Sequence, residues 1–139
     1  SISVGSVLTP AGLDKSIGLI STTYMKDPTD PAWASDPAMQ EWRAFMAKYY
    51  PEGNLADNSN VFGYAIAQTL VHVLRACGDN LTRENIMKQA ASLKDMQIAL
   101  LLPGVRLNTG AEDFAPIQSM QLMKFDGRTW VRFGEVMGN

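Results

Sequence analysis

The sequence has few of the residues that carry out most protein chemistry. Its 139 residues include one cysteine, Cys77, and one histidine, His72. A single cysteine excludes a disulfide within the chain and leaves the redox compartment open. A single histidine, without a second histidine or a suitably spaced carboxylate, argues against a metal centre or a catalytic triad. We therefore expect no metal, no cofactor and no enzyme site.

Long apolar runs and charge of one sign are also lacking. Gln68, His72 and Arg75 interrupt the longest apolar stretch, so no run is suited to span a bilayer. The amino terminus, SISVGSVLTPAG, has neither a basic start nor a signal-type apolar core, so we expect no targeting segment in this chain. The 12 Lys and Arg are scattered among 14 Asp and Glu. A nucleic-acid partner is therefore not expected.

What the sequence does contain is a series of short elements with clear boundaries. Residues 3–13 read as the end of a short helix that Pro10 and Gly12 stop. The apolar and β-branched run 17–24 predicts a strand. Together with the helices described below, this strand indicates an α/β domain.

A proline-rich connector follows the strand, over residues 26–35. Pro28 and Pro31 each follow an aspartate, and the residue before proline avoids the helical region, so the segment should be extended or turning. We expect Asp27 and Asp30 to accept hydrogen bonds from nearby backbone N–H groups rather than to form an acid–base pair.

Three helices are predicted after the connector. Asp36 is expected to cap the first, with Pro37 at its first position. The second covers 61–77, with Gly78 as a left-handed cap and with candidate amino-terminal caps at Asn58, Ser59 and Asn60. It is apolar on nearly every side, so we expect it to be mostly buried. The third runs from Thr82 to about residue 93.

The carboxyl-terminal part predicts strands. Short runs at 98–102 and 105–107 read as strands separated by Pro103 and Gly104. Asp126 and Gly127 predict a two-residue hairpin turn between strands 120–125 and 128–136. In that register the cross-strand apolar neighbours are Leu122 with Val131, and Met120 with Phe133.

Several ordered stretches carry a family resemblance. They are "KDPTDPAW", "DPAMQEWRAFMAKYYPEG", "NVFGYAIAQTLVHVLRACGDNLTRENIMKQAASL" and "LLPGVRLNTGAEDFAPIQSMQLMKFDGRTWVRFGEV". In this order they resemble the carboxyl-terminal portion of ABC-importer solute-binding proteins of the branched-chain amino acid type. Members of that family are considerably longer than this chain, so the resemblance implies a fragment whose partners include a missing amino-terminal part.

The resemblance implies a two-lobed Venus-flytrap fold of the type I periplasmic-binding-protein class. Residues 1–25 are then expected to end the second lobe, 26–112 to belong to the first lobe, and 113–139 to cross back and form a hairpin in the second. Lobe closure needs hinge residues at the crossings. The candidates are Met25, Lys26, Asp27, Pro28, Asp113 and Phe114.

The implied function is capture of a small solute for a membrane permease, outside the cytoplasm. The expected ligand contacts are Asn58, Ser59, Asn60, Phe62 and Tyr24. The first four lie at a helix amino terminus, which favours a carboxylate. The same residues also suit plain capping and core packing, and Tyr24 suits packing at the hinge, so both interpretations stay open. An aromatic carboxylate and a branched-chain amino acid are the candidate solutes, and the side chains favour the aromatic acid.

Two other functions remain as alternatives. The same lobes occur in ligand-sensing domains of receptors and regulators, where closure signals to an attached module. Alternatively, the chain is a small hydrolase or transferase that uses His72. Neighbouring permease and ATPase genes, or loss of turnover on replacing His72, would distinguish these cases.

Overall fold

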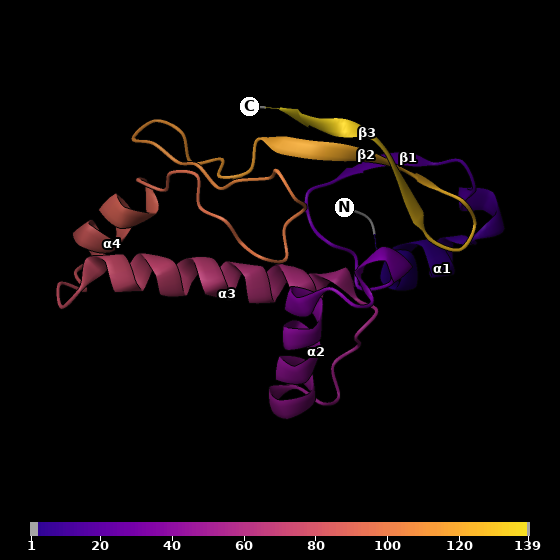
Figure 1. Ribbon diagram of the computed structural model, residues 1–139, viewed down its shortest axis with the longest axis horizontal. Helices are drawn as coiled ribbons and strands as arrows, with labels where there is room; N and C mark the ends of the chain where they lie inside the picture. Colours follow the sequence, from indigo (N-terminus) through magenta and orange to yellow (C-terminus); the bar gives the residue numbers. More distant parts are fainter. Residues whose placement is uncertain (1–2, 139) are drawn as a thin grey trace.

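A computed structural model describes residues 3–138 of the chain. The sheet lies at one end of the molecule, the long helix α3 runs away from it, and α2 projects from the amino-terminal part of α3 (Figure 1). The predicted second-lobe segment begins at residue 1, so its first two residues lie outside the described part. In chain order the elements are η1 (Val4–Leu8), α1 (Thr9–Ala11), η2 (Asp14–Ser16), β1 (Ile20–Thr23), η3 (Pro31–Trp33), α2 (Pro37–Tyr49), α3 (Asn58–Cys77), α4 (Arg83–Ala90), β2 (Ser119–Phe125) and β3 (Trp130–Gly138).

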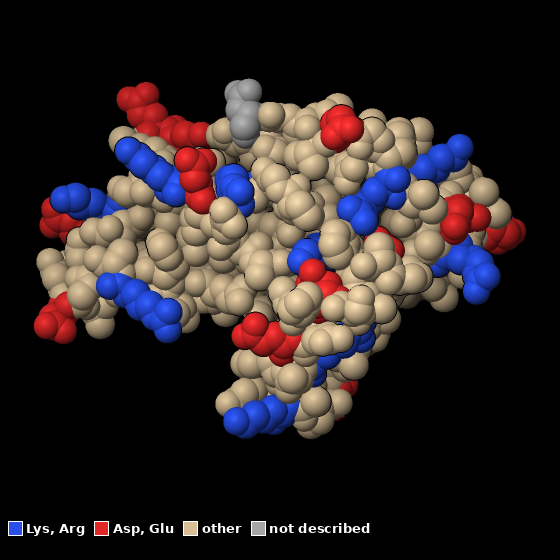
Figure 2. Space-filling view, viewed as in Figure 1, with Lys and Arg blue, Asp and Glu red and all other residues tan. Residues whose placement is uncertain are grey.

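One face of the molecule carries charges of both signs without separating them. On the face shown in Figure 2, Lys and Arg lie interspersed with Asp and Glu, and no large area has one sign. Among residues 3–138, no helix combines the length and the apolar character needed to cross a membrane.

The amino-terminal helical segment ends where the sequence predicted but passes through its proline. Pro10 lies at the second position of α1, which follows η1 directly, so the helical segment continues through it. Gly12 ends the helix with a φ of +98°, which glycine adopts without strain. The prediction that Gly12 stops the helix is confirmed, and the prediction that Pro10 does so is wrong.

The amino-terminal capping residue was predicted correctly for α2 and α4 and wrongly for α3. Asp36 caps α2, and its Oδ1 accepts a hydrogen bond from the Met39 N–H at 3.0 Å, as expected. Thr82 caps α4 as expected, although that helix ends at Ala90. The cap of α3 is Asp57, whose Oδ1 accepts from the Ser59 N–H at 2.9 Å.

The predicted capping residues of α3 are therefore wrong, because each lies inside the helix. Asn58, Ser59 and Asn60 lie in the first turn of the helix, because Asp57 stands before them and is an equally good capping residue. At the other end Gly78 has a φ of +56° but a ψ of −135°. The positive φ was expected, whereas that ψ is not the left-handed helical value.

The strands predicted over 98–102 and 105–107 do not form. The segment makes single bridges instead, one of which joins Leu101 to Met25. Its backbone closes local turns, with the Leu101 N–H donating to the Ile98 carbonyl and the Val105 N–H to that of Leu102. Three consecutive leucines, 100–102, are all buried. Three buried side chains in a row do not alternate between a buried and a solvent-facing side, as those of a half-buried strand do. The backbone here makes hydrogen bonds within local turns instead of pairing with a neighbouring strand.

The sheet has three antiparallel strands in the order β1–β2–β3. The hairpin exists as predicted, but Phe133 faces Leu122 and Val131 faces Lys124. The loop centres on Gly127 and Arg128, one residue later than expected. Gly127 has a φ of +104°, and Asp126 is not among the described residues with positive φ. A turn that needs positive φ only at its first central position is favoured when glycine occupies that position. The pairing of β2 with β3 is therefore shifted by two residues from the predicted register. Because the shift is an even number, each side chain stays on its predicted face of the sheet.

Two separate hydrophobic clusters make up the core. The larger draws its buried residues from positions 25–107 and includes Trp42 and Met39, both fully buried. The smaller is built from Leu8, Met123, Phe125 and Trp130, with Val4 and Leu13 packed against it. The buried residues of the first and last parts of the chain therefore share one cluster, and those of the middle part form the other, against which Ile117 and Val136 also pack.

The expectation that α3 is mostly buried is wrong for this chain. Val61, Ala65 and Val73 are buried, but five large apolar side chains on the helix are at least 36% exposed. These residues are Phe62, Ile66, Leu70, Val71 and Leu74. Two short helices and the irregular segment 96–117 are too few to cover every face of a 20-residue helix.

Candidate functional site

A small cavity lies at the amino terminus of α3, beside the end of β1. It has a volume of about 190 Å³. Both apolar and polar side chains line it, which is the composition expected of a site that orients a small molecule. Its lining residues are Ser3, Tyr24, Met25, Asn58, Ser59 and Phe62.

Four of the five predicted ligand contacts line this cavity. Asn58 is buried, Ser59 is exposed, and Phe62 remains 42% exposed, so its ring is open to contact. Asn60 is not among the lining residues, and its Nδ2 donates to the Asn54 carbonyl at 2.9 Å. The Asn60 side chain therefore stabilises the loop that precedes α3.

The helix end beside the cavity is only partly available to an anion. The Asp57 side chain accepts from the Ser59 N–H, and its carbonyl accepts from the Asn60 N–H at 3.1 Å. The carboxylate also places a negative charge at the positive end of the helix dipole. Attraction for a carboxylate is therefore weaker than the sequence alone suggested.

Tyr24 reaches the cavity from the carboxyl end of β1. Its backbone carbonyl accepts a hydrogen bond from the Leu102 N–H at 2.9 Å, which fixes the residue against the larger cluster. Burial raises the pKa of the Tyr24 phenol above its ordinary value. The phenol is therefore protonated at neutral pH and available as a hydrogen-bond donor.

Ser3 is the lining residue that sequence reasoning missed. It is buried, and its Oγ accepts from the Ser6 N–H at 3.4 Å, which caps η1. A capping rule applied to the amino terminus could have located this helix start. Its approach to Asn58 and Phe62 depends on the fold and has no local signal.

The first predicted crossing is buried and tied to the larger cluster. Met25 is 4% exposed and Lys26 is 7% exposed. The Lys26 N–H donates to the Leu100 carbonyl at 2.9 Å, and Met25 forms a bridge with Leu101. The backbone here is thus as constrained as that of a paired strand.

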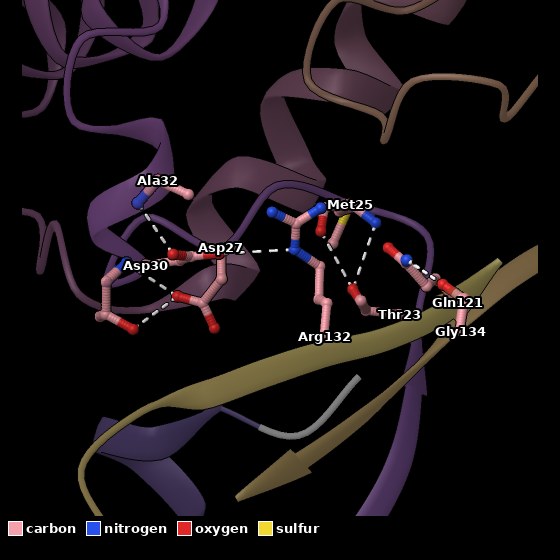
Figure 3. Close-up of polar contacts among 9 residues, drawn as sticks. Thr23, Met25, Asp27, Asp30, Ala32, Gln121, Arg132 and Gly134 are labelled. Atoms are coloured by element: carbon pink, nitrogen blue, oxygen red, sulfur yellow. Dashed lines mark hydrogen bonds and ion pairs between the residues drawn. The ribbon is translucent and has the colours of Figure 1, made fainter. Parts of the chain in front are cut away.

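The connector beyond Lys26 is a series of aspartate-stabilised turns, as Figure 3 shows for Asp27 and Asp30. Asp27 Oδ1 accepts from both the N–H and the hydroxyl of Thr29, at 2.8 and 2.6 Å. The Pro28 carbonyl accepts from Arg43 of α2 at 2.8 Å. The prediction that these aspartates serve turns is confirmed.

Lys26 and Asp36 form a partly buried ion pair at the end of this connector. Their Nζ and Oδ2 atoms are 2.7 Å apart, with the side chains 9% and 18% exposed. Burial alone would raise the pKa of Asp36. Hydrogen bonds from the Lys26 side chain and the Met39 N–H outweigh it and lower the pKa below its ordinary value.

The second predicted crossing is far more open. Asp113 and Phe114 are exposed, the phenyl ring to 64%. Asp113 holds its own loop, since Oδ1 accepts from the Ala115 N–H at 2.9 Å and Oδ2 contacts the Gln118 amide. Within the described part of the chain, Phe114 is not among the buried or partly buried residues of either cluster.

A larger groove of about 400 Å³ runs between α3, α4 and residues 96–117. Its exposed lining is entirely apolar. It shares Tyr24, Met25 and Phe62 with the small cavity, but it offers no polar surface that could orient an acid. We therefore assign the candidate site to the small cavity.

The two chemically reactive residues lie elsewhere. His72 is exposed and lines a groove with Glu41 and Arg75, and Cys77 is buried at the end of α3. Among the residues described, no group of three or more His, Cys, Asp or Glu is arranged to hold a metal ion.

Comparisons with known proteins give two similarities. A family profile described as "Periplasmic binding protein" matches residues 3–129. A solved structure, a branched chain amino acid ABC transporter from Thermus thermophilus with bound valine, matches with a TM-score of 0.71 and 14% identity. The match covers 96% of this chain and 36% of that one. No curated protein matches the sequence. At this identity the solved structure shows the fold, which is that of part of a type I periplasmic binding protein.

Proposed function

This chain belongs to the periplasmic binding protein family, and from that membership we propose that it is part of the extracytoplasmic solute-binding component of an ABC importer. The family consists of binding proteins rather than enzymes. The solute is captured between two lobes, and because it binds the closed arrangement better, it shifts the population toward the form that a membrane permease recognises. The chain spans 36% of the solved structure that it matches, and in this proposal the remainder of a full-length protein supplies the other contacts.

The two hydrophobic clusters support a division into lobes. The smaller cluster combines buried residues from the amino-terminal segment and from β2 and β3, whereas the larger takes its buried residues from 25–107. In this proposal 1–25 and 113–139 contribute to one lobe and 26–112 to the other. The hinges are then Met25, Lys26, Asp27 and Pro28 at one crossing, and Asp113 and Phe114 at the other.

The observation that carries the proposal is the composition of the small cavity. Ser3 comes from the segment assigned to the second lobe, while Asn58 and Phe62 come from the first. A solute bound here would contact both lobes and so favour their closed arrangement. A site within one lobe would give no such coupling.

We propose an aromatic carboxylate as the solute. The Phe62 ring and the Tyr24 phenol offer aromatic surface, and the hydroxyls of Ser59 and Tyr24 offer hydrogen-bond donors. None of the six described lining residues is acidic, so they provide no partner for the ammonium group of an amino acid. A planar acid needs no such partner.

Calorimetry on the protein as its gene encodes it tests the proposal. The panel is benzoate, 4-hydroxybenzoate, cyclohexanecarboxylate, valine and leucine. We expect the two aromatic acids to bind more tightly than the saturated ring and the amino acids, because aromatic stacking adds to the buried area. Binding of valine and leucine alone would exclude the aromatic class, and binding of no member of the panel would contradict the proposal.

Phe62→Leu measures the contribution of the ring. We expect benzoate affinity to fall about fivefold, since loss of one aromatic contact is worth roughly 1 kcal/mol. Phe45→Leu is the matched control, because Phe45 is 40% exposed and lies on α2, outside the cavity. Equal effects of the two substitutions would show that Phe62 acts through stability alone.

A further inference from the structure

One side chain of the carboxyl-terminal hairpin reaches the connector at two points. Arg132 on β3 places its Nε 3.5 Å from Asp30 Oδ2, with the side chains 25% and 15% exposed. Its guanidinium carbon lies 4.5 Å from the centre of the Trp33 ring. The ion pair and the cation–π contact are partly shielded from bulk water, so salt screens them less than it screens fully exposed pairs but still weakens them.

The Trp33 ring has a second cation nearby. Lys26 Nζ lies 5.0 Å from the ring centre and forms the ion pair with Asp36. The indole is thus contacted by two cations, each paired with its own carboxylate. Four members of this cluster come from residues 26–36, and Arg132 is the one that comes from the hairpin.

The carboxylate that pairs with Arg132 is held in place by its own turn. Asp30 caps η3, and its Oδ1 accepts from the Ala32 N–H at 2.9 Å, which leaves Oδ2 directed toward Arg132 (Figure 3). A side chain already held by a turn loses little rotamer entropy when it pairs. The contact therefore keeps more of its electrostatic energy than a pair of free surface side chains does.

We propose that Arg132 is a positioning residue that latches the first crossing to the hairpin and so favours the arrangement in which Ser3 and Asn58 line one cavity. Residues 102 positions apart meet here, and in the proposed two-lobe division they lie on opposite sides of the hinge. Loss of Arg132 frees the connector from the hairpin while the Lys26–Asp36 pair stays intact. The effect on solute binding rests on the proposed function, whereas the effect on the connector does not.

Hydrogen exchange tests the latch without any solute. In Arg132→Met the amides of Ala32, Trp33 and Ala34 should exchange about fivefold faster or more, while those in the middle of α2 are unchanged. Arg128→Met is the control, since it removes the same charge from the hairpin loop without touching the connector. Unchanged exchange at 32–34 in a folded Arg132→Met protein would overturn the proposal.

Arg132→Lys separates a latch from a general packing role. Lysine keeps the charge but lacks the planar group that stacks on an indole, so we expect exchange rates between those of the wild type and Arg132→Met. This conservative variant also serves if Arg132→Met does not fold. Identical exchange in Arg132→Lys and wild type at both low and high salt would contradict the role of the stacked guanidinium.

Solute binding gives the second readout, on the gene-encoded protein with benzoate and valine as probes. For whichever probe binds, Arg132→Met should weaken affinity by roughly three- to tenfold, because the binding-competent arrangement is less populated. Wild-type affinity should fall between about 0.05 and 0.5 M salt, and that of the variant should change less. If wild type and Arg132→Met had equal affinities and equal salt dependences, the proposed coupling of Arg132 to lobe closure would be wrong. If neither probe binds wild type, the solute proposal fails and hydrogen exchange still decides the latch.

Discussion

The two predicted crossings between the lobes differ in almost every physical respect. The first, residues 25–28, together with the connector that follows it up to Asp36, contains a lysine that is only 7% exposed, an ion pair of 2.7 Å and an indole contacted by two cations. The second, near Asp113, is held by hydrogen bonds within its own loop and carries a phenyl ring that is 64% exposed. The first crossing and its connector contact both the larger hydrophobic cluster and the carboxyl-terminal hairpin, whereas the hydrogen bonds of the second crossing lie mainly within its own loop.

This contrast indicates how bending is distributed between the crossings. A segment with few buried contacts changes its backbone angles at low cost, whereas a segment in a packed cluster resists the same change. We therefore expect lobe motion to be absorbed mainly near 113–118, while the first crossing and its connector act as the firm pivot. Matched substitutions at the two crossings test this difference.

Loss of the aspartate carboxylate should be most costly at the first crossing. Asp36→Ala removes the cap of α2 and leaves Lys26 buried without its partner, so we expect unfolding free energy to fall by about 3 kcal/mol. Asp113→Ala should cost less than about 1 kcal/mol, because its loop is exposed. Urea denaturation measures both. Asp36→Asn keeps a side chain that can cap the helix and so measures the contribution of the charge alone. Similar losses of unfolding free energy in Asp36→Ala and Asp113→Ala would contradict the proposed difference between the two crossings.

Removal of the aromatic side chain should show the same order with a smaller effect. Trp33→Ala deletes a half-buried ring and two cation–π contacts, which should lower stability by about 2 kcal/mol. Phe114→Ala should change it by no more than about 0.5 kcal/mol. Thermal and urea unfolding of the two variants provide the comparison, and a larger loss for Phe114→Ala would reverse our assignment of the firm crossing.

Acid should weaken the first crossing selectively, and we expect this to be the smallest of the three effects. The pKa of Asp36 is lowered in the folded protein, so its ionised form stabilises the fold. That contribution is complete above the unfolded-state pKa of about 3.9 and is lost as the pH falls through the lower folded value.

Asp36→Asn lacks this loss, so the stability difference between wild type and the variant should shrink as the pH drops below about 4. Asp126, whose pKa is lowered by N–H groups of Thr129 and Arg128, contributes equally to both proteins and cancels. A difference that stays constant with pH would show that the Asp36 charge is not involved.

Sequence reasoning succeeded where the signal was local. The Asp36 cap, the aspartate turns and the existence of the hairpin each depend on a few neighbouring residues. The failures depend on tertiary structure. Segment 98–107 forms turns under consecutive buried leucines, and α3 exposes apolar side chains because the described elements do not cover it.

The candidate site shows the same limit. Four of the five predicted contacts line the cavity, because they share one helix end and one strand end. Asn60 turns to its own loop, and Ser3 arrives from the other end of the chain. Arg132 also lacked a sequence signal, since its partner Asp30 is 102 positions away and neither residue has a local pattern that marks the pair.

The position of Trp33 gives the molecule an optical readout of its own. The chain has three tryptophans, and Trp42 and Trp130 are 0% and 3% exposed, whereas Trp33 is half-buried between Lys26 and Arg132. A soluble quencher such as acrylamide therefore reaches the Trp33 indole first, and the accessible part of the emission comes from the first crossing. Fluorescence can follow this one segment without a label and without a change to the sequence.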